Sequence, residues 1–309
     1  MRITLFALTG MGNHVLRALL RGGEEVVAII TRPEAHEFPY FRMENLATEA
    51  GRFGIPVTQI GSTGRAWHAE AETCAGRSDL VLVATFNRII PVDRIVWARS
   101  GAYNIHPSLL PRHKGPRPVF WTVRCGDSEY GFSVHRLTSR VDEGEVYFQR
   151  RLRLGDVTMG AAFQDLCSDV ERQTPAVLAA VLDRRPIDIR GEVGEYEPRP
   201  TGAHLMAELT QDGCRALKSI LSLLPFPGVW MAGDGGVVRI CGAELLKPGV
   251  ADVAPGTVVE RADRWVVIAV GLHRLRLAVG DGPLPPRGSV LVGCPAPAST
   301  DDATPAGLA

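Results

Sequence analysis

The chain has 309 residues, of which 45% are hydrophobic and 22% are charged, and its formal net charge at pH 7 is zero. This composition is that of an ordinary globular protein, so it excludes a disordered chain and gives no sign of a polyanion-binding surface. The length allows two domains. The first apolar run, Ile3 to Leu8, is too short for a signal-peptide core or a membrane span, so we expect a cytoplasmic protein with no membrane partner.

Strands and helices are predicted to alternate through the first half of the chain. The expected strands are 2–8, 26–31, 56–60, 80–84 and 101–105, and the expected helices are 13–20, 44–53 and 91–98. This alternation predicts an α/β domain with a Rossmann-like, mostly parallel sheet and helices on both faces. Strands at 131–137 and 145–154 and an amphipathic helix at 158–182 complete a first domain, 1–185.

The second half of the chain has a different pattern. Residues 186–204 are rich in Pro, Gly and charged residues, which is typical of a linker. A helix is expected at 205–223, followed by short strands at 229–231, 237–243, 256–259, 265–269 and 275–279. Short strands between Gly turns predict a smaller β-rich domain, an OB-like barrel, over 205–294. Residues 295–309 are small and polar, and we expect a disordered tail.

The cysteines and the first glycine turn suggest no cofactor. Six cysteines are scattered at 74, 125, 167, 214, 241 and 294, without metal-ligand or redox spacing, so reduced thiols and no metal are expected. Gly10 and Gly12 follow the first strand, but the dinucleotide motif needs a glycine at Val15 and an acidic residue near Thr31. A plain strand-to-helix turn is therefore favoured over a nicotinamide site.

Polar side chains near the middle of the chain carry the clearest chemical signal. Asn104 and His106 are two residues apart on a predicted strand, so both leave the same face. Asp142 lies in a polar turn before Gly144. An amide stabilises an oxyanion, an imidazole moves a proton near neutral pH, and a carboxylate holds an imidazole. We expect these groups to meet at the carboxyl edge of the sheet and to move an acyl group between nitrogens.

A longer run of motifs surrounds these residues. It comprises Asn-Ile-His-Pro-Ser-Leu-Leu-Pro at 104–111, Gly115, Pro118, Trp121, Gly-Phe-Ser-Val-His at 131–135 and Asp-Glu-Gly at 142–144. Pro-Phe-Pro-Gly at 225–228 agrees more loosely. Over about residues 80–150 the chain resembles the folate-dependent formyltransferase family. That family includes methionyl-tRNA formyltransferase, glycinamide ribonucleotide formyltransferase and amino-sugar N-formyltransferases.

The resemblance implies an enzyme that transfers a formyl group from 10-formyltetrahydrofolate to an amine without a metal. Asn104, His106 and Asp142 match the family's catalytic residues. The positions that match its folate-binding segments are Phe86, Asn87, Arg88, Ile89, Ile90, Pro91, Thr138, Ser139, Arg140 and Val141. The positions expected beside the donor and the acceptor are Ser108, Leu109, Leu110, Pro111 and His113. The oligomeric state, a homodimer included, is left open.

Two nearby features have plain structural interpretations. His135 lies on the predicted strand 131–137, and a packed strand histidine is the favoured interpretation. The aromatic run at 38–41 (Phe-Pro-Tyr-Phe) is interpreted as an ordinary packed loop rather than as the wall of an acceptor pocket.

The acceptor is a choice between a small amine and initiator tRNA. Phosphate contacts dominate tRNA binding, and enzymes of this family that act on tRNA tend to carry a basic linker and a basic second domain. Here acidic residues interrupt the linker, and residues 201–309 hold 9 basic and 10 acidic residues. A small biosynthetic amine, such as an amino sugar or an ornithine-type compound, is therefore favoured over initiator tRNA. A formyltetrahydrofolate hydrolase or a non-catalytic folate-binding regulator is a weaker alternative.

Overall fold

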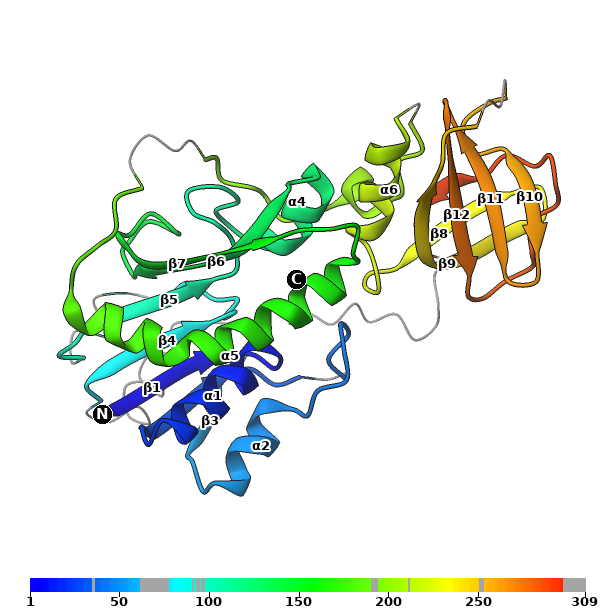
Figure 1. The fold of residues 1–309 in the computed structure, drawn as a ribbon. Helices are drawn as coiled ribbons and strands as arrows, with labels where there is room; N and C mark the ends of the chain where they lie inside the picture. The colour runs from blue at the N-terminus through cyan, green and yellow to red at the C-terminus, as the bar shows by residue number, and fades with distance from the viewer. Residues whose placement is uncertain are drawn as a thin grey trace.

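The N-terminal part of the protein is built on one seven-stranded sheet. The structure is a computed structural model that describes residues 1–34, 37–61, 78–90, 92, 95, 98–189, 194–210, 212–249 and 253–296. The strands are β1 (Arg2–Ala7), β2 (Glu25–Thr31), β3 (Val57–Gln59), β4 (Leu80–Ala84), β5 (Ala102–His106), β6 (Glu129–Arg136) and β7 (Val146–Arg153). They lie in the order β3-β2-β1-β4-β5-β6-β7 (Figure 1). The first five pair in parallel, and β6 and β7 are antiparallel.

Both faces of this sheet bury apolar side chains. The helices are α1 (Met11–Arg21), α2 (Leu46–Arg52), α4 (Pro118–Cys125) and α5 (Met159–Asp183). Leu5 of β1 and Leu82 of β4 pack in the core that contains α1 and α5, whereas the adjacent Phe6 and Val83 pack in a second core. Strands buried on both faces are typical of a doubly wound sheet. The predicted Rossmann-like sheet is confirmed; most of the predicted helix 91–98 lies outside the described residues.

The C-terminal part forms a separate antiparallel sheet (yellow to orange strands in Figure 1). Its strands, in the order β10-β11-β12-β9-β8-β13, are β8 (Val229–Gly233), β9 (Gly236–Leu246), β10 (Val258–Ala262), β11 (Trp265–Val270), β12 (His273–Val279) and β13 (Val292–Cys294). Backbone bonds from Val258 N to Ser289 O and from Leu291 N to Gly256 O, each 2.9 Å, join its two edges. The sheet therefore closes into the small barrel that the strand pattern predicted.

The helix predicted at 205–223 is shorter than expected. A 3-10 turn, η2 (Gly202–Leu205), ends where the predicted helix was to begin, and the observed helix is α6 (Gly213–Leu221). The side chain of Asp212 accepts hydrogen bonds from the backbone N–H groups of Cys214 and Arg215, which fixes the start of the helix at this point. α6 packs against both α4 and β9, so it lies between the two sheets (Figure 1).

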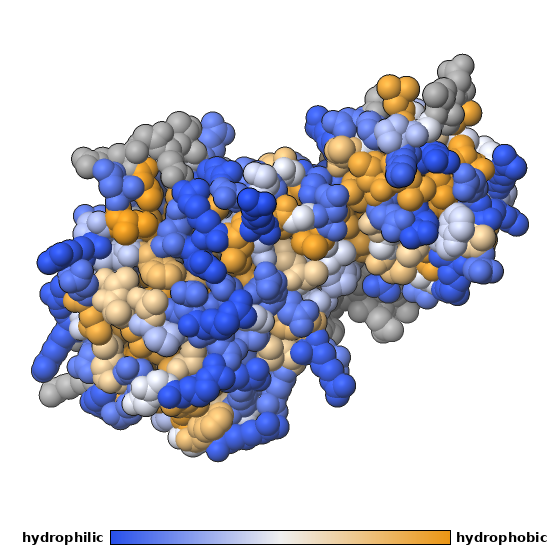
Figure 2. Space-filling view, viewed as in Figure 1, coloured by the Kyte–Doolittle hydropathy of each residue, from blue (hydrophilic) through white to orange (hydrophobic). Residues whose placement is uncertain are grey.

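The surface in view carries hydrophilic residues over both parts of the molecule (Figure 2). Within the described residues, none of the helices combines the length and the apolar character that a membrane crossing requires.

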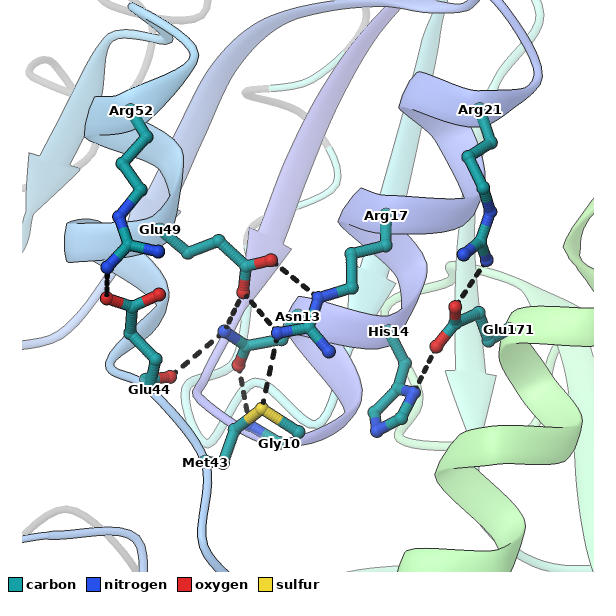
Figure 3. Close-up of polar contacts among 10 residues, drawn as sticks. All are labelled: Gly10, Asn13, His14, Arg17, Arg21, Met43, Glu44, Glu49, Arg52 and Glu171. Carbon is teal, nitrogen blue, oxygen red and sulfur yellow. Dashed lines mark hydrogen bonds and ion pairs between the residues drawn. The ribbon is translucent and has the colours of Figure 1, made fainter.

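A buried polar network holds the turn after β1 (Figure 3). The side chain of Asn13 is fully buried; its oxygen accepts from Gly10 N at 2.9 Å and its nitrogen donates to Glu49 Oε2 at 2.6 Å. Arg17 donates to the same carboxylate at 2.5 Å and 3.0 Å. The ring of Phe38 covers Gly10, where a Cβ atom would lie 2.5 Å from the ring. An occupied N–H and a covered surface support the plain turn over a dinucleotide site.

We predict that Asn13→Ala lowers the free energy of unfolding by about 2–3 kcal/mol, because it strands the buried Gly10 N–H and removes one donor from the Glu49 carboxylate. Urea unfolding measures this change. Thr48→Ala, at an exposed position on α2, is the matched control and should change stability by less than about 0.5 kcal/mol. Equal stability of the two variants would contradict a structural role for the network.

Candidate active site

A cavity of about 440 Å³ lies at the carboxyl ends of β1, β4 and β5. The sheet order changes direction between β1 and β4, and open α/β sheets bind ligands at such a point. Thr9 follows β1, Thr85 follows β4, and Asn104 and His106 end β5; all four line the cavity. The volume lies in the range of pockets that hold small-molecule ligands.

The carboxylate of Asp142 is the centre of the polar groups in this cavity. Its Oδ1 atom lies 3.6 Å from His106 Nδ1 and 3.3 Å from His135 Nε2, and it accepts from Asn104 Nδ2 at 3.5 Å. Its Oδ2 atom accepts from Gly115 N at 2.8 Å. The structure therefore brings together the amide, the imidazole and the carboxylate that the sequence singled out.

Backbone carbonyls orient both imidazoles toward this carboxylate. His106 Nε2 lies 2.9 Å from the carbonyl oxygen of His113, and His135 Nδ1 lies 3.0 Å from that of Arg136. A carbonyl oxygen only accepts, so each of these nitrogens carries a hydrogen. The opposite nitrogens, His106 Nδ1 and His135 Nε2, then face Asp142.

Burial and charge set opposite protonation states in this group. Burial lowers the pKa of His106, and the nearby Asp142 charge offsets this only in part, so the imidazole is uncharged at neutral pH. Burial alone would raise the pKa of Asp142. The positive charge that His106 carries when protonated, followed by the contact with His135 and the hydrogen bond from Gly115 N–H, outweighs it and holds that pKa well below its usual value. The resting site is therefore a neutral imidazole beside an anionic carboxylate.

His135 contacts this centre although the sequence favoured a packed strand histidine. The antiparallel register of β5 and β6 places it directly opposite Asn104, and its Nε2 atom lies 3.1 Å from the Asn104 amide nitrogen. Side chains of directly paired residues lie close enough to interact. A prediction of this contact needs the pairing register of the two strands, which no local motif specifies.

Left-handed backbone conformations at non-glycine residues gather around the site. Thr85, Arg117 and Asp142, which line the cavity, have φ of 55°, 62° and 54°, and His113, whose carbonyl holds His106, has φ of 53°. Such conformations each cost on the order of 1 kcal/mol or more and concentrate at functional sites. The fold maintains them where they direct side chains and carbonyls toward the cavity.

The segments matched to folate binding lie mainly on the cavity wall. The lining positions are Phe86, Asn87, Arg88, Ile89, Ile90, Thr138, Arg140 and Val141. Ser139 is exposed and is not among the lining residues, and Pro91 lies outside the described residues. Ile89 and Val141 are 76% and 41% exposed, so two apolar side chains on the cavity wall remain accessible to a ligand.

The loop expected beside donor and acceptor lies behind the cavity wall. Ser108, Leu109 and Leu110 are almost fully buried, and with Pro111 and His113 they are outside the set of lining residues. Leu110 N donates to Ser133 Oγ at 2.9 Å, which ties the loop to β6. These contacts hold in place the loop that carries the His113 carbonyl.

Aromatic and basic side chains form another part of the cavity wall. Phe38, Tyr40 and Phe163 line it, and their rings pack edge-on or tilted against one another. The guanidinium of Arg117 lies over the Tyr40 ring at 5.9 Å. Arg199, from the predicted linker, also lines the cavity. The aromatic loop at 38–41 is thus part of the cavity as well as a packed loop.

Comparisons with known proteins identify the family of the chain. A family model described as formyl transferase matches residues 11–182. A methionyl-tRNA formyltransferase from Afipia carboxidovorans is 30% identical over 286 residues, covering 90% of each chain, and one from Thiobacillus denitrificans is 25% identical over 289 residues, covering 90% of this chain and 92% of its own length.

Solved structures show the same fold at low identity. The sugar 3N-formyl transferase WlaRD, crystallised with dTDP and 5-N-formyl-THF, has a TM-score of 0.68 at 12% identity, covering 90% of this chain and 97% of its own. HypX from Aquifex aeolicus in complex with tetrahydrofolic acid has a TM-score of 0.59 at 16% identity, covering 90% of this chain and 43% of its own.

We predict that Asp142→Asn lowers the pKa of His106 further, because the Asp142 charge is the interaction that raises it against burial. The His106 ring protons, followed by NMR through a pH titration, report the change. Glu143→Gln, at the exposed neighbouring carboxylate, is the control and should leave the His106 pKa nearly unchanged. An unchanged or raised His106 pKa in Asp142→Asn would show that the carboxylate does not act on this ring.

Proposed function

The chain belongs to the formyl transferase family, and from this premise we propose an N-formyltransferase that uses 10-formyltetrahydrofolate to formylate a small biosynthetic amine, of amino-sugar or ornithine type. The observation that carries the proposal is the convergence of Asn104, His106 and His135 on one oxygen of Asp142, inside a cavity. An amide donor, a neutral imidazole and a buried carboxylate are the groups that acyl transfer to nitrogen requires.

The cavity suits the folate donor in size and in chemistry. Phe86, Ile90 and Leu137 give apolar surface to the wall on which a flat ring can lie, while Ile89 and Val141 leave apolar surface for a ligand to cover. The segments 86–90 and 138–141 would hold the folate. When bound, 10-formyltetrahydrofolate supplies an activated formyl group on a nitrogen leaving group.

The residues around Asp142 can perform the proton and charge transfers. Attack by an uncharged amine places negative charge on the formyl oxygen, and the Asn104 amide, a donor on the cavity wall, would stabilise it. His106 Nδ1 faces away from the His113 carbonyl and is able to take the proton that the amine loses. Asp142 stabilises the resulting imidazolium at 3.6 Å, and the imidazolium can return the proton to the leaving nitrogen.

We predict that Asn104→Ala lowers kcat by roughly 10²- to 10³-fold, since the loss of one oxyanion donor typically raises the barrier by about 3–4 kcal/mol. Release of tetrahydrofolate in the presence of the amine reports turnover. The dissociation constant of the folate, measured by calorimetry, should change little, which separates a lost transition-state contact from a damaged pocket. A variant with near-normal kcat would remove Asn104 from the proposed chemistry.

The aromatic and basic part of the cavity wall is consistent with a small acceptor. Tyr40 and Phe163 offer apolar surface, and Arg117 and Arg199 offer positive charge to an anionic group on the acceptor. On the barrel, three arginines lie beside carboxylates: Arg239–Asp281 at 3.5 Å, Arg274–Glu260 at 3.1 Å and Arg276–Glu244 at 2.7 Å. Each of these pairs carries no net charge, so together they give the barrel no basic surface for a phosphate backbone.

Methionyl-tRNA formylation is the second candidate, because curated relatives at 25–30% identity carry that name over 90% of this chain. We predict weak binding of initiator tRNA at physiological salt and turnover with a member of an amine panel of amino sugars and ornithine derivatives.

Arg117→Ala should raise the acceptor KM by about tenfold or more, while the folate affinity should remain unchanged.

Arg215→Ala is the matched control for Arg117→Ala, because Arg215 is exposed on α6 and pairs with Glu208 outside the cavity. It should leave the acceptor KM unchanged. Tight tRNA binding with a steep dependence on salt, and turnover with charged tRNA alone, would replace the small amine by tRNA as the acceptor.

A further inference from the structure

A second group of chemically active side chains lies beside the catalytic loop and outside the cavity. His113 precedes α4, Cys125 ends α4, and Glu197 lies in the segment after residue 194. One ligand atom from each, an imidazole nitrogen, a thiol sulfur and a carboxylate oxygen, lies within 4.8 Å of the others. None of these three residues lines the active-site cavity, so the chemistry described above does not account for them.

The hydrogen bonding of His113 leaves one ring nitrogen directed into this group. Its Nε2 atom lies 3.2 Å from Asp127 Oδ2, and a carboxylate only accepts, so Nε2 carries a hydrogen. The Nδ1 atom is buried and has no hydrogen-bond partner among the described residues, and it lies 3.6 Å from Glu197 Oε1. The side chain is 9% exposed. A buried ring nitrogen that has no hydrogen-bond partner and lies near a carboxylate oxygen can share a cation with it.

We propose that His113 Nδ1, Cys125 Sγ and a Glu197 carboxylate oxygen bind a zinc ion, with water as the fourth ligand. Nitrogen, sulfur and oxygen donors of this kind are those that zinc prefers, whereas the thiol disfavours magnesium and calcium. Asp127 then completes the arrangement in which a carboxylate holds the outer N–H of a zinc-bound histidine.

The local geometry requires only a small adjustment to bind the ion. Tetrahedral zinc, with bonds of about 2.0–2.3 Å, places its ligand atoms roughly 3.5 Å apart. The ligand atoms, within 4.8 Å of one another, contract by about an ångström, and Cys125 is exposed and free to rotate. The carboxylates of Asp127 and Glu197, 3.2 Å and 3.6 Å from the His113 ring nitrogens, favour a cation here, and zinc binding releases the thiol proton to solvent.

The ion would join parts of the chain that are distant in sequence. Backbone pairing already places this segment against the loop, with Glu197 N donating to Lys114 O at 2.8 Å. Zinc would fix His113 in the same place, and the His113 carbonyl accepts from the catalytic His106 at 2.9 Å. The site thus serves as a structural clamp on the residue whose carbonyl orients the His106 imidazole.

The full-length protein, purified without chelator or metal-affinity resin, should contain close to one zinc per chain by elemental mass spectrometry. The chelated protein should take up cobalt with a thiolate charge-transfer band in the near ultraviolet. Cys125→Ser and Glu197→Gln should each lose zinc, and Cys125→Ser should lose the band. Asp127→Asn should bind zinc roughly 10- to 100-fold more weakly. Zinc should raise the melting temperature of the wild type and leave that of Cys125→Ser unchanged.

Cys214→Ser is the matched control, because Cys214 is an exposed free cysteine at the start of α6 and should not affect zinc or cobalt binding. Circular dichroism establishes that each variant is folded. Absence of zinc in the purified wild type together with failure of the protein to bind added zinc would overturn the proposal. A cobalt band that persists in Cys125→Ser would also overturn it. A proton shared by His113 and Glu197 would then be the cation between them.

Discussion

The buried charge of Asp142 is the interaction on which the organisation of the site depends. A carboxylate withdrawn from water needs compensation from donors around it. Here Gly115 N–H donates to one oxygen and Asn104 Nδ2 to the other, which the two imidazoles also face. These groups come from β5, β6 and the loop before α4, so the charge holds the three segments in one arrangement.

The same charge determines what the histidines can do. Burial keeps His106 uncharged and ready to accept a proton, and the carboxylate beside it stabilises the charged form when it appears. The carbonyl of His113 fixes which ring nitrogen is available. A proton acceptor of defined direction therefore results from main-chain and side-chain contacts that exist before any ligand binds.

The sequence predicted those parts of the site that follow from local patterns, but not those that depend on contacts between distant segments. The two-residue period of a strand was enough to place Asn104 and His106 on one face, and the motif at 142–144 indicated their partner. The contact of His135 depends on strand register, and the positions of Tyr196 and Arg199 in the cavity depend on a segment far along the chain. The predicted helix 205–223 was wrong in its start, because Asp212 caps a helix that begins at Gly213. Several polar residues lie before this helix, and the sequence alone does not show which of them is the cap.

Gly115 lies in the loop before α4 and allows the segment that contains Tyr196 and Glu197, which connects the two parts of the chain, to pass close to that loop. A Cβ atom at this position would lie 2.5 Å from the carbonyl oxygen of Glu197, so only glycine permits the close crossing. The crossing brings Tyr196 and Arg199 to the cavity, although they belong to neither sheet. Under the proposed function, acceptor preference can therefore evolve by exchange of a connecting segment, with Asn104, His106 and His135 on β5 and β6 and both hydrophobic cores unchanged.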